Sequence, residues 1–129
     1  MATFELTAEN LDASIQNNDV LVIDFWAEWC GPCRSFAPVF EAASDKFEGI
    51  GFAKCDTEAQ QSIAANFGIR SIPTIAIFRE QILLYFQPGA MPPAGLDDIL
   101  GQVQALDMDD VRAKIAAAEA EKESDQGGE

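Results

Sequence analysis

The sequence predicts an α/β protein in three layers, with a mixed central β-sheet flanked by helices. Apolar runs rich in β-branched and aromatic residues alternate along the chain with segments of helical periodicity, the pattern of a layered α/β fold. The last two runs, 74–78 and 82–86, are only three residues apart and predict an antiparallel hairpin. A chain of 129 residues is long enough to bury one core of its own.

The first elements are expected before the cysteine-containing segment. A short edge strand over residues 4–6 leads into a helix through 11–15, for which Thr7 is the predicted cap. Residues 20–26 then form a nearly continuous apolar run. Such a run is typical of a central strand that is buried on both faces.

The next elements alternate between helix and strand. Apolar residues recur at helical spacing after Cys33, and this helix should bend at Pro38 because proline lacks the amide hydrogen. A strand is expected over 49–53, followed by a short helix over about 57–67. The hairpin comes next, and after it a core helix is expected that opens with two prolines and carries four apolar residues on one face: Leu96, Ile99, Leu100 and Val103.

The character of the chain changes after about Ala105, so we expect a domain over 1–105 and a C-terminal extension over 106–129. Asp107 could cap a short amphipathic helix whose apolar face is Met108, Val111 and Ile115. The segment from Glu119 onward is charged and ends in glycines. That composition predicts a disordered acidic tail.

Charge excludes some classes of partner. The chain has 22 acidic and 8 basic residues, a net charge of −14, which argues against binding to nucleic acid or to anionic membranes. No apolar run approaches the roughly 20 residues of a membrane span, and the first residues lack the features of a secretory signal. We therefore expect a cytoplasmic protein.

Three cysteines, Cys30, Cys33 and Cys55, suggest three interpretations. A structural zinc site would need two more ligands beside the Cys-x-x-Cys pair, yet there is no histidine and one other cysteine, so we expect no metal. A chance pair in the core is the second, but Gly31 and Pro32 between the cysteines are turn residues. A redox-active pair is the third and the one we adopt.

The position of this pair predicts the roles of the two thiols. A strand, a short loop and a helix opening place Cys30 at a helix N-terminus, where free amides and the helix dipole stabilise a thiolate. Thiolate is the attacking species in disulfide exchange, so Cys30 is the expected nucleophile. Cys33 lies one turn later, should be less exposed, and would attack the mixed disulfide to release the reduced substrate.

Residues 26–33, Trp-Ala-Glu-Trp-Cys-Gly-Pro-Cys, resemble the active-site segment of the thioredoxin family. Lys54, the segment 67–74 (Phe-Gly-Ile-Arg-Ser-Ile-Pro-Thr) and Gly89 fall at the spacing of the same family. The resemblance covers about residues 4–105. It implies the thioredoxin fold and a protein-disulfide reductase that serves cellular redox homeostasis.

The resemblance also implies further site residues. Asp24 matches a buried strand aspartate that exchanges a proton with the resolving cysteine, and burial should raise its pKa toward neutrality. A purely structural polar residue is the alternative. Lys54 matches a lysine that tunes this carboxylate, with a solvated surface amine as the alternative. Pro73 matches a cis-proline beside the sulfur atoms.

A flat apolar patch for extended substrates is implied in the same way. Simple core packing is the alternative for Trp29, although Trp26, inside the strand, is the better core candidate. The expected patch residues are Trp29, Gly31, Pro32, Ile72, Pro73 and Gly89.

The implied partners are disulfide-containing client proteins and a flavoprotein thioredoxin reductase that supplies electrons from NADPH; no cofactor is expected to be bound. We expect a monomer, with a weak dimer as the alternative. Two other functions stay open: a disulfide oxidase or isomerase of an oxidising compartment, and a co-chaperone or binding module that uses the apolar patch and the acidic tail. The co-chaperone or binding module is disfavoured because such modules often lack a cysteine or the aspartate, whereas this chain has both cysteines and the aspartate.

Three features depart from the family pattern. Glu80 and Gln81 stand where an Asn-Gly type turn is usual, so we expect a distorted or longer turn. The strand 83–86 is too apolar for an open edge, so we expect a cover from the C-terminal helix or from another subunit. Cys55 is expected to be a buried spectator, with a regulatory thiol as the alternative.

Overall fold

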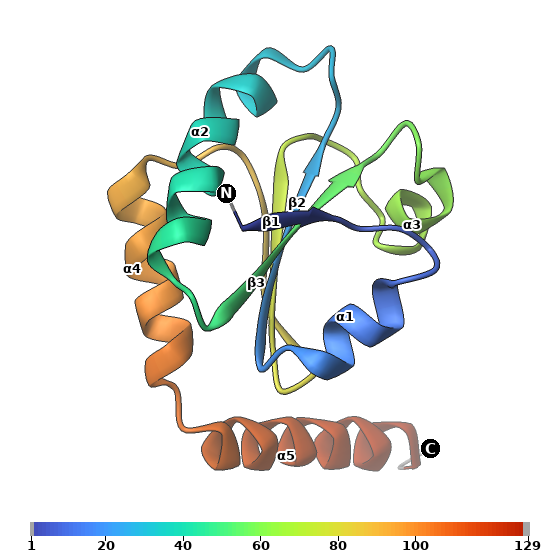
Figure 1. The fold of residues 1–129 in the computed structure, drawn as a ribbon. Coiled ribbons are helices and arrows are strands. Elements are labelled where there is room, and N and C mark those ends of the chain that lie inside the picture. The colour runs from blue at the N-terminus through green and yellow to red at the C-terminus, as the bar shows by residue number, and fades with distance from the viewer. Residues whose placement is uncertain (1, 128–129) are drawn as a thin grey trace.

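The computed structural model describes residues 2–127, which form a five-stranded sheet with helices on both faces (Figure 1). None of the described helices is long and apolar enough to cross a membrane. In chain order the elements are β1 (Thr3–Glu5), α1 (Leu11–Asn17), β2 (Val20–Trp26), α2 (Gly31–Lys46), β3 (Ile50–Asp56), α3 (Gln61–Asn66), β4 (Thr74–Arg79), β5 (Ile82–Pro88), α4 (Pro93–Ala105) and α5 (Met108–Gly127).

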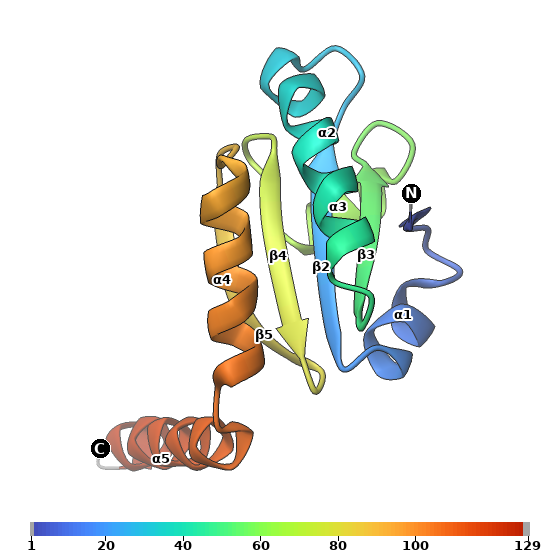
Figure 2. The same cartoon turned by 60° about the vertical axis from the view of Figure 1, so that its left-hand side comes forward.

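The sheet is mixed, as predicted. Its strand order is β1-β3-β2-β4-β5, with β1, β3 and β2 parallel and with β4 and β5 antiparallel to their neighbours. Helices α2 and α4 cover one face, and α1 and α3 cover the other (Figures 1 and 2). The three-layer architecture and the central position of β2 are therefore confirmed.

Strand β2 distributes its side chains between two cores. Val20 and Val22 belong to the core under α2 and α4, whereas Leu21, Ile23 and Phe25 belong to the core under α1 and α3. Because side chains alternate along a strand, Asp24 takes a position on the α2 side of the sheet. Burying each of the large apolar side chains of β2 contributes about 1.5–3 kcal/mol to the stability of the fold. The strand that carries Asp24 is thus held from both faces.

Two local predictions about the helices were wrong. The N-cap position of α1 is Asn10 and not Thr7. Thr7 instead closes the preceding turn: its hydroxyl accepts the Asn10 N–H at 3.3 Å, while its own N–H donates to Asn10 Oδ1 at 2.8 Å. Helix α3 is shorter than expected because residues 57–60 turn at the end of β3, where Asp56 Oδ1 accepts two backbone N–H groups.

The β4–β5 turn is not longer than usual, contrary to our expectation. Arg79 pairs with Ile82, which leaves a turn of two residues, Glu80 and Gln81, with φ of 50° and 69°. Two successive positive φ angles are those of the type I′ turn, which suits the twist of a hairpin. The irregularity lies further along the ladder: Ile77 of β4 pairs with Tyr85 and Phe78 pairs with Leu83, so Leu84 of β5 is the extra residue.

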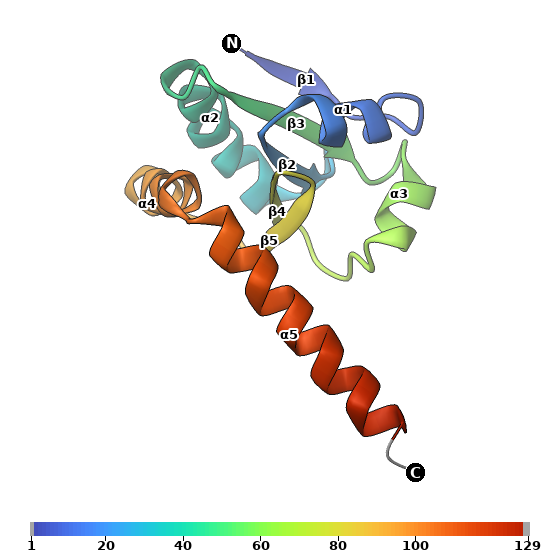
Figure 3. The ribbon, with the colours of Figure 1, turned by 90° about the horizontal axis from the view of Figure 1, so that it is seen from below.

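Strand β5 is covered on one face by α4 and not by α5. Leu84 and Tyr85 pack on the core that contains Leu100 and Val103 of α4, whereas Leu83 is 44% exposed. The views in Figures 1 and 3 show α5 crossing below the lower end of the sheet and projecting beyond it. A cover by the C-terminal helix was therefore the wrong expectation, and a cover by another subunit stays a prediction.

Helix α5 is longer than predicted and replaces most of the expected disordered tail. It is helical from Met108 to Gly127, and residues 128–129 lie outside the described part. The physical reason is the run over 116–123, in which alanine, glutamate and lysine, all strong helix formers, alternate. The Lys114–Asp110 ion pair at 3.0 Å adds support one turn apart. The domain division at Ala105 stays a prediction.

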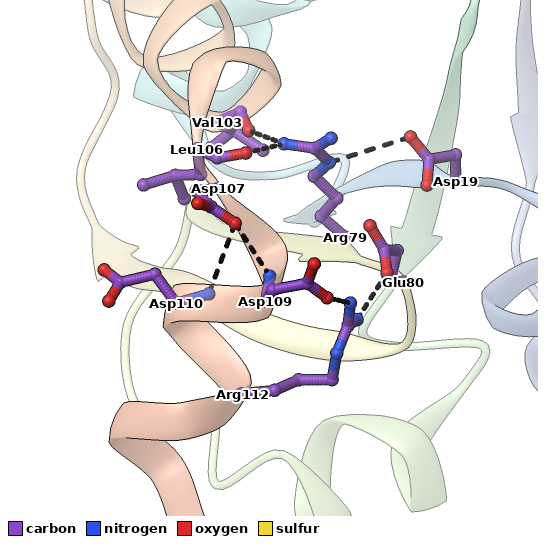
Figure 4. A network of polar contacts seen from close by, with 9 residues as sticks. All are labelled: Asp19, Arg79, Glu80, Val103, Leu106, Asp107, Asp109, Asp110 and Arg112. Carbon is purple, nitrogen blue, oxygen red and sulfur yellow. Dashed lines mark hydrogen bonds and ion pairs between the residues drawn. The ribbon is translucent and has the colours of Figure 1, made fainter.

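Two arginines anchor the start of α5 (Figure 4). Arg79 Nη1 donates to the carbonyl oxygens of Val103 at 2.8 Å, Gln104 at 3.1 Å and Leu106 at 2.8 Å, at the exposed end of α4. Arg112 bridges Glu80 of the hairpin turn, at 2.5 Å, and Asp109, at 2.8 Å. The hairpin and the first turn of α5 are therefore tied to each other.

Candidate active site

The cysteine pair lies where the carboxyl end of β2 turns into α2. Antiparallel pairing of β2 with β4 sets Phe25 opposite Thr74, so the end of β2 meets the start of β4. Residues just before β4, including Pro73, are thereby brought to the cysteine loop from 40 residues further along the chain. In Figure 1 this loop is at the top of the molecule.

Cys30 is the N-cap of α2, as expected from the sequence. Its backbone is extended, and its Sγ accepts the N–H of Cys33 at 3.2 Å. The two cysteines form a disulfide, with their Cα atoms 5.2 Å apart. Both are nearly covered, Cys30 at 4% and Cys33 at 2% exposure, so the expected difference in access is small. The amide and the dipole at this position favour a thiolate once the disulfide opens.

Pro73 and Gly89 shape the backbone facing the sulfur atoms. The Ile72–Pro73 bond is cis, which confirms the expected isomer. The Ile72 carbonyl oxygen lies 3.7 Å from Cys30 Sγ. Gly89 donates its N–H to the Pro73 carbonyl at 2.7 Å with a φ of 105°, a conformation that a side chain would strain. The segment around Pro73 is thus fixed against the cysteine pair.

Asp24 is fully buried, and neither of its oxygens has a hydrogen-bond donor among the described residues. Burial raises the pKa of this carboxyl from 3.8 to about 7, and the positive charge of Lys54 lowers it in part. Asp24 and Lys54 are register partners in the β2–β3 ladder. Lys54 Nζ also lies 4.8 Å from the centre of the Trp26 ring. The carboxyl can therefore change its protonation state near neutral pH.

Trp29 is the most exposed large apolar side chain among those described, at 68%. Its indole N–H donates to Glu58 Oε1 at 2.7 Å. Exposure rules out the alternative of simple core packing for Trp29. The half-buried Trp26 is the more enclosed of the two, although its own Nε1 has no partner among the described residues.

A groove of about 310 Å³ opens beside Trp29 and leads toward Ile72. Of the expected patch residues, only these two line it; Gly31, Pro32 and Gly89 are exposed around the cysteine loop, and Pro73 is buried. The groove is lined by Trp29, Thr57, Ala64, Ile69, Arg70, Ser71 and Ile72.

Sequence reasoning missed Glu58 and Arg70 as site residues. Glu58 follows the carboxyl end of β3, the edge of a sheet where ligand-binding residues gather, and that signal was available. Arg70 lies within the segment 67–74 that carries the family resemblance. No hydrogen bond within the described chain joins Asp24 to either cysteine.

Cys55 takes no part in this site. Its side chain is fully buried in the core under α1 and α3, as expected. Burial, with the charges of Asp56 and Asp24 adding to it, raises the pKa of this thiol to about 11. A thiol that stays protonated and covered is a poor nucleophile.

A helix N-terminus that holds one sulfur of a disulfide and can stabilise it as a thiolate serves one kind of chemistry. Opening and closing that disulfide exchanges two electrons with another sulfur pair. The fold and the site therefore define a thiol-disulfide oxidoreductase.

Known proteins agree with this class. A family model described as Thioredoxin matches residues 2–101. A Streptomyces coelicolor protein named "Putative thioredoxin 2" is 51% identical over 120 residues, which cover 93% of this chain and 90% of the relative. The thioredoxin of Porphyra purpurea is 38% identical over 104 residues, covering 79% and 97%.

Solved structures show the same likeness. Thioredoxin from Malassezia sympodialis matches with a TM-score of 0.70 and 34% identity, over 79% of this chain and 93% of the other. A mutant thioredoxin from Halobacterium salinarum matches with a TM-score of 0.76 and 28% identity, over 81% and 93%. The chain belongs to the thioredoxin family, and it is a protein-disulfide reductase with a redox-active cysteine pair.

Proposed function

We propose that Cys30 is the nucleophile of this reductase and Cys33 the resolving thiol. The observation that carries the proposal is the position of Cys30 Sγ at the N-terminus of α2, where it accepts the Cys33 N–H at 3.2 Å. In the reduced protein that amide and the helix dipole would favour a negative charge on Cys30. Cys33, one turn later, lacks this stabilisation.

The reaction balances in two exchanges. The Cys30 thiolate attacks one sulfur of a client disulfide, forming a mixed disulfide, and the other client sulfur leaves and takes up a proton. Cys33 then loses its proton to the Asp24 carboxylate and attacks Cys30 Sγ, which releases the second client thiol. The client gains two electrons, and the Cys30–Cys33 disulfide is restored.

The groove and the cysteine loop would hold the client. The accepting surface beside Cys30 would be formed by Trp29, Gly31, Pro32, Ile72, Pro73 and Gly89. Lys54 would adjust the pKa of Asp24. The contact of 3.7 Å between the Ile72 carbonyl oxygen and Cys30 Sγ supports a client backbone running past Ile72.

Electrons would return to the dithiol from NADPH through a flavoprotein thioredoxin reductase, with no cofactor held by this chain. We place this cycle in the cytoplasm, the compartment where thiols are kept reduced. Turnover of a protein disulfide with NADPH and the host's reductase tests the route. Failure to oxidise NADPH when all three are present would contradict it.

The two cysteine roles are tested with a trapping experiment. Cys33→Ser should attack a client disulfide and then stop, so a mixed disulfide on Cys30 accumulates and is found by mass spectrometry of peptides. Cys30→Ser should not attack at all. Cys55→Ser is the matched control and should turn over normally, since Cys55 is buried away from the site. An adduct on Cys33 or Cys55 would show that the assignment is wrong.

A further inference from the structure

Among the described residues, Arg70 is a cation without a partner, in an acidic protein. The chain has 22 acidic residues for 8 basic ones, and most described basic side chains have a partner. Lys46, Arg79, Arg112 and Lys114 form ion pairs, and Lys54 lies over Trp26. Arg70 is exposed, and its side chain has no ion pair or hydrogen bond with any described residue.

The position of Arg70 also points to a binding role. Arg70 lines the groove of about 310 Å³ that Trp29 and Ile72 also line. Apolar walls with one charged group are typical of sites that orient a ligand by that group. Arg34, which follows Cys33, is likewise exposed and unpaired among the described residues, but it does not line the groove.

The groove lies beside the reacting sulfur, and Ile72 links the two. Ile72 contributes to the groove wall, and its carbonyl oxygen lies 3.7 Å from Cys30 Sγ. A client cysteine bound at Cys30 therefore brings its neighbours in the chain over the groove. An extended chain advances about 3.3 Å per residue, so these neighbours lie within about three residues of the cysteine.

The carboxylate near the groove does not neutralise Arg70. Glu58 accepts the indole N–H of Trp29 at 2.7 Å and forms no ion pair with the arginine. Guanidinium groups bind carboxylates with two parallel hydrogen bonds, a geometry that a lysine does not offer. The net charge of −14 repels acidic surfaces in general, so a local cation in the groove would select where an acidic segment binds.

We propose that this groove takes an extended client segment in which an aspartate or glutamate lies two residues before or after the reacting cysteine, on the same side of the extended chain, and that Arg70 binds that carboxylate. This inference rests on the proposed function, because it assumes that Cys30 is the sulfur that the client meets. It makes Arg70 a specificity-determining residue of the reductase. The disulfide chemistry itself is unchanged.

The test uses the reduced protein and a set of matched peptides. Each peptide carries one cysteine in a disulfide with the same small thiol, and the residue two positions before or after that cysteine is Glu, Gln or Lys. Single-turnover rate constants are measured for all peptides. For one of the two positions, the Glu peptide should react about two- to fivefold faster than the Gln peptide, as expected for an exposed ion pair.

Two variants assign the preference to the groove. Arg70→Gln should remove it, and Arg70→Glu should reverse it in favour of Lys. Arg34→Gln is the matched control, since it removes an equally exposed arginine near the cysteines but outside the groove, and it should keep the preference. Salt at 0.5 M should weaken the preference of the unaltered protein by screening.

Two results would overturn the inference: no preference for Glu at either position, or a preference that survives Arg70→Gln or disappears with Arg34→Gln. The Gln peptide separates this failure from failure of the proposed function. If the protein reduces that peptide and Cys30→Ser does not, the cysteine roles hold and only the acidic specificity is lost.

Discussion

The Asp24 carboxyl is buried in β2 without a hydrogen-bond donor from any described residue, and its pKa is about 7 in the folded protein. In the unfolded chain the same group titrates near 3.8. Between these two values the unfolded chain binds fewer protons than the folded one, so stability falls as pH rises from about 4 to about 7. The cost reaches its full size above pH 7 and is on the order of 4 kcal/mol.

Replacing Asp24 with Asn removes this titration. The Asp24→Asn variant should be more stable than the parent at pH 8 by up to a few kcal/mol, and the difference should shrink steadily as pH is lowered to 4. Urea unfolding at several pH values measures it. Asp12→Asn is the matched control, because it makes the same substitution at an exposed position, and it should not reproduce the effect. A difference that does not vary with pH would contradict this account.

Lys54 acts on the same carboxyl through its charge. Since Lys54 lowers the pKa of Asp24, Lys54→Gln should raise that pKa, and fewer Asp24 carboxylates would then be available at pH 7. The Cys33-dependent release step should become slower at pH 7 but recover at pH 9, where Asp24 is ionised in both proteins. Stopped-flow measurement of release from pH 6 to 9 checks this. Lys114→Gln, which removes a charge from α5, should leave the profile unchanged.

Among the elements, the β4–β5 hairpin carries local strain in its turn. Gln81 has a φ of 69°, a left-handed conformation that glycine adopts without steric cost. Gln81→Gly should therefore stabilise the protein by about 0.5–1 kcal/mol after the loss of chain entropy is counted. Gln87→Gly makes the same change in β5, where the backbone is not left-handed, and should destabilise. Equal effects of both substitutions in urea unfolding would show that the turn is unstrained.

Among the described side chains of helix α5, those that contact the domain lie at the beginning of the helix. Met108 is buried, and the Leu106 carbonyl accepts a hydrogen bond from Arg79. Truncation after Ala105 removes both contacts and should cost about 1.5–3 kcal/mol of stability, while turnover per folded molecule stays normal. Truncation after Ala118 keeps both contacts and should change neither quantity. Loss of turnover in a folded Ala105 truncate would show that the extension serves the active site.

For the molecule as a whole, sequence reasoning succeeded where a signal is local or periodic. The run 20–26 predicted β2 because a strand that is buried on both faces needs continuous apolar residues. The segment from Cys30 to Cys33 predicted the helix N-terminus because the residues that form the first turn of a helix are neighbours in the sequence. Sequence reasoning failed for contacts between segments that are far apart in the chain. Nothing near Trp29 in the sequence indicates that Glu58 accepts its indole N–H, and the groove position of Arg70 follows from the pairing of β2 with β4.

The C-terminal helix shows a second kind of failure. Its high charge predicted disorder from Glu119, whereas the helical preference of its alanines and glutamates decides its conformation. Amino-acid composition indicates whether a segment can form a hydrophobic core. It does not indicate whether a helix whose first turns are held by contacts, such as the Arg112–Glu80 ion pair, continues beyond those contacts.

The 20 residues of α5 extend about 30 Å, and the helix lies at the end of the molecule opposite the cysteine loop (Figure 1). A dye, bead or fused domain attached along this helix would therefore sit remote from the entrance that clients use. Attachment through α5 would immobilise the protein on a column in one orientation, with the cysteine loop facing the solution. Clients trapped by the Cys33→Ser variant could then be washed and released by added dithiol.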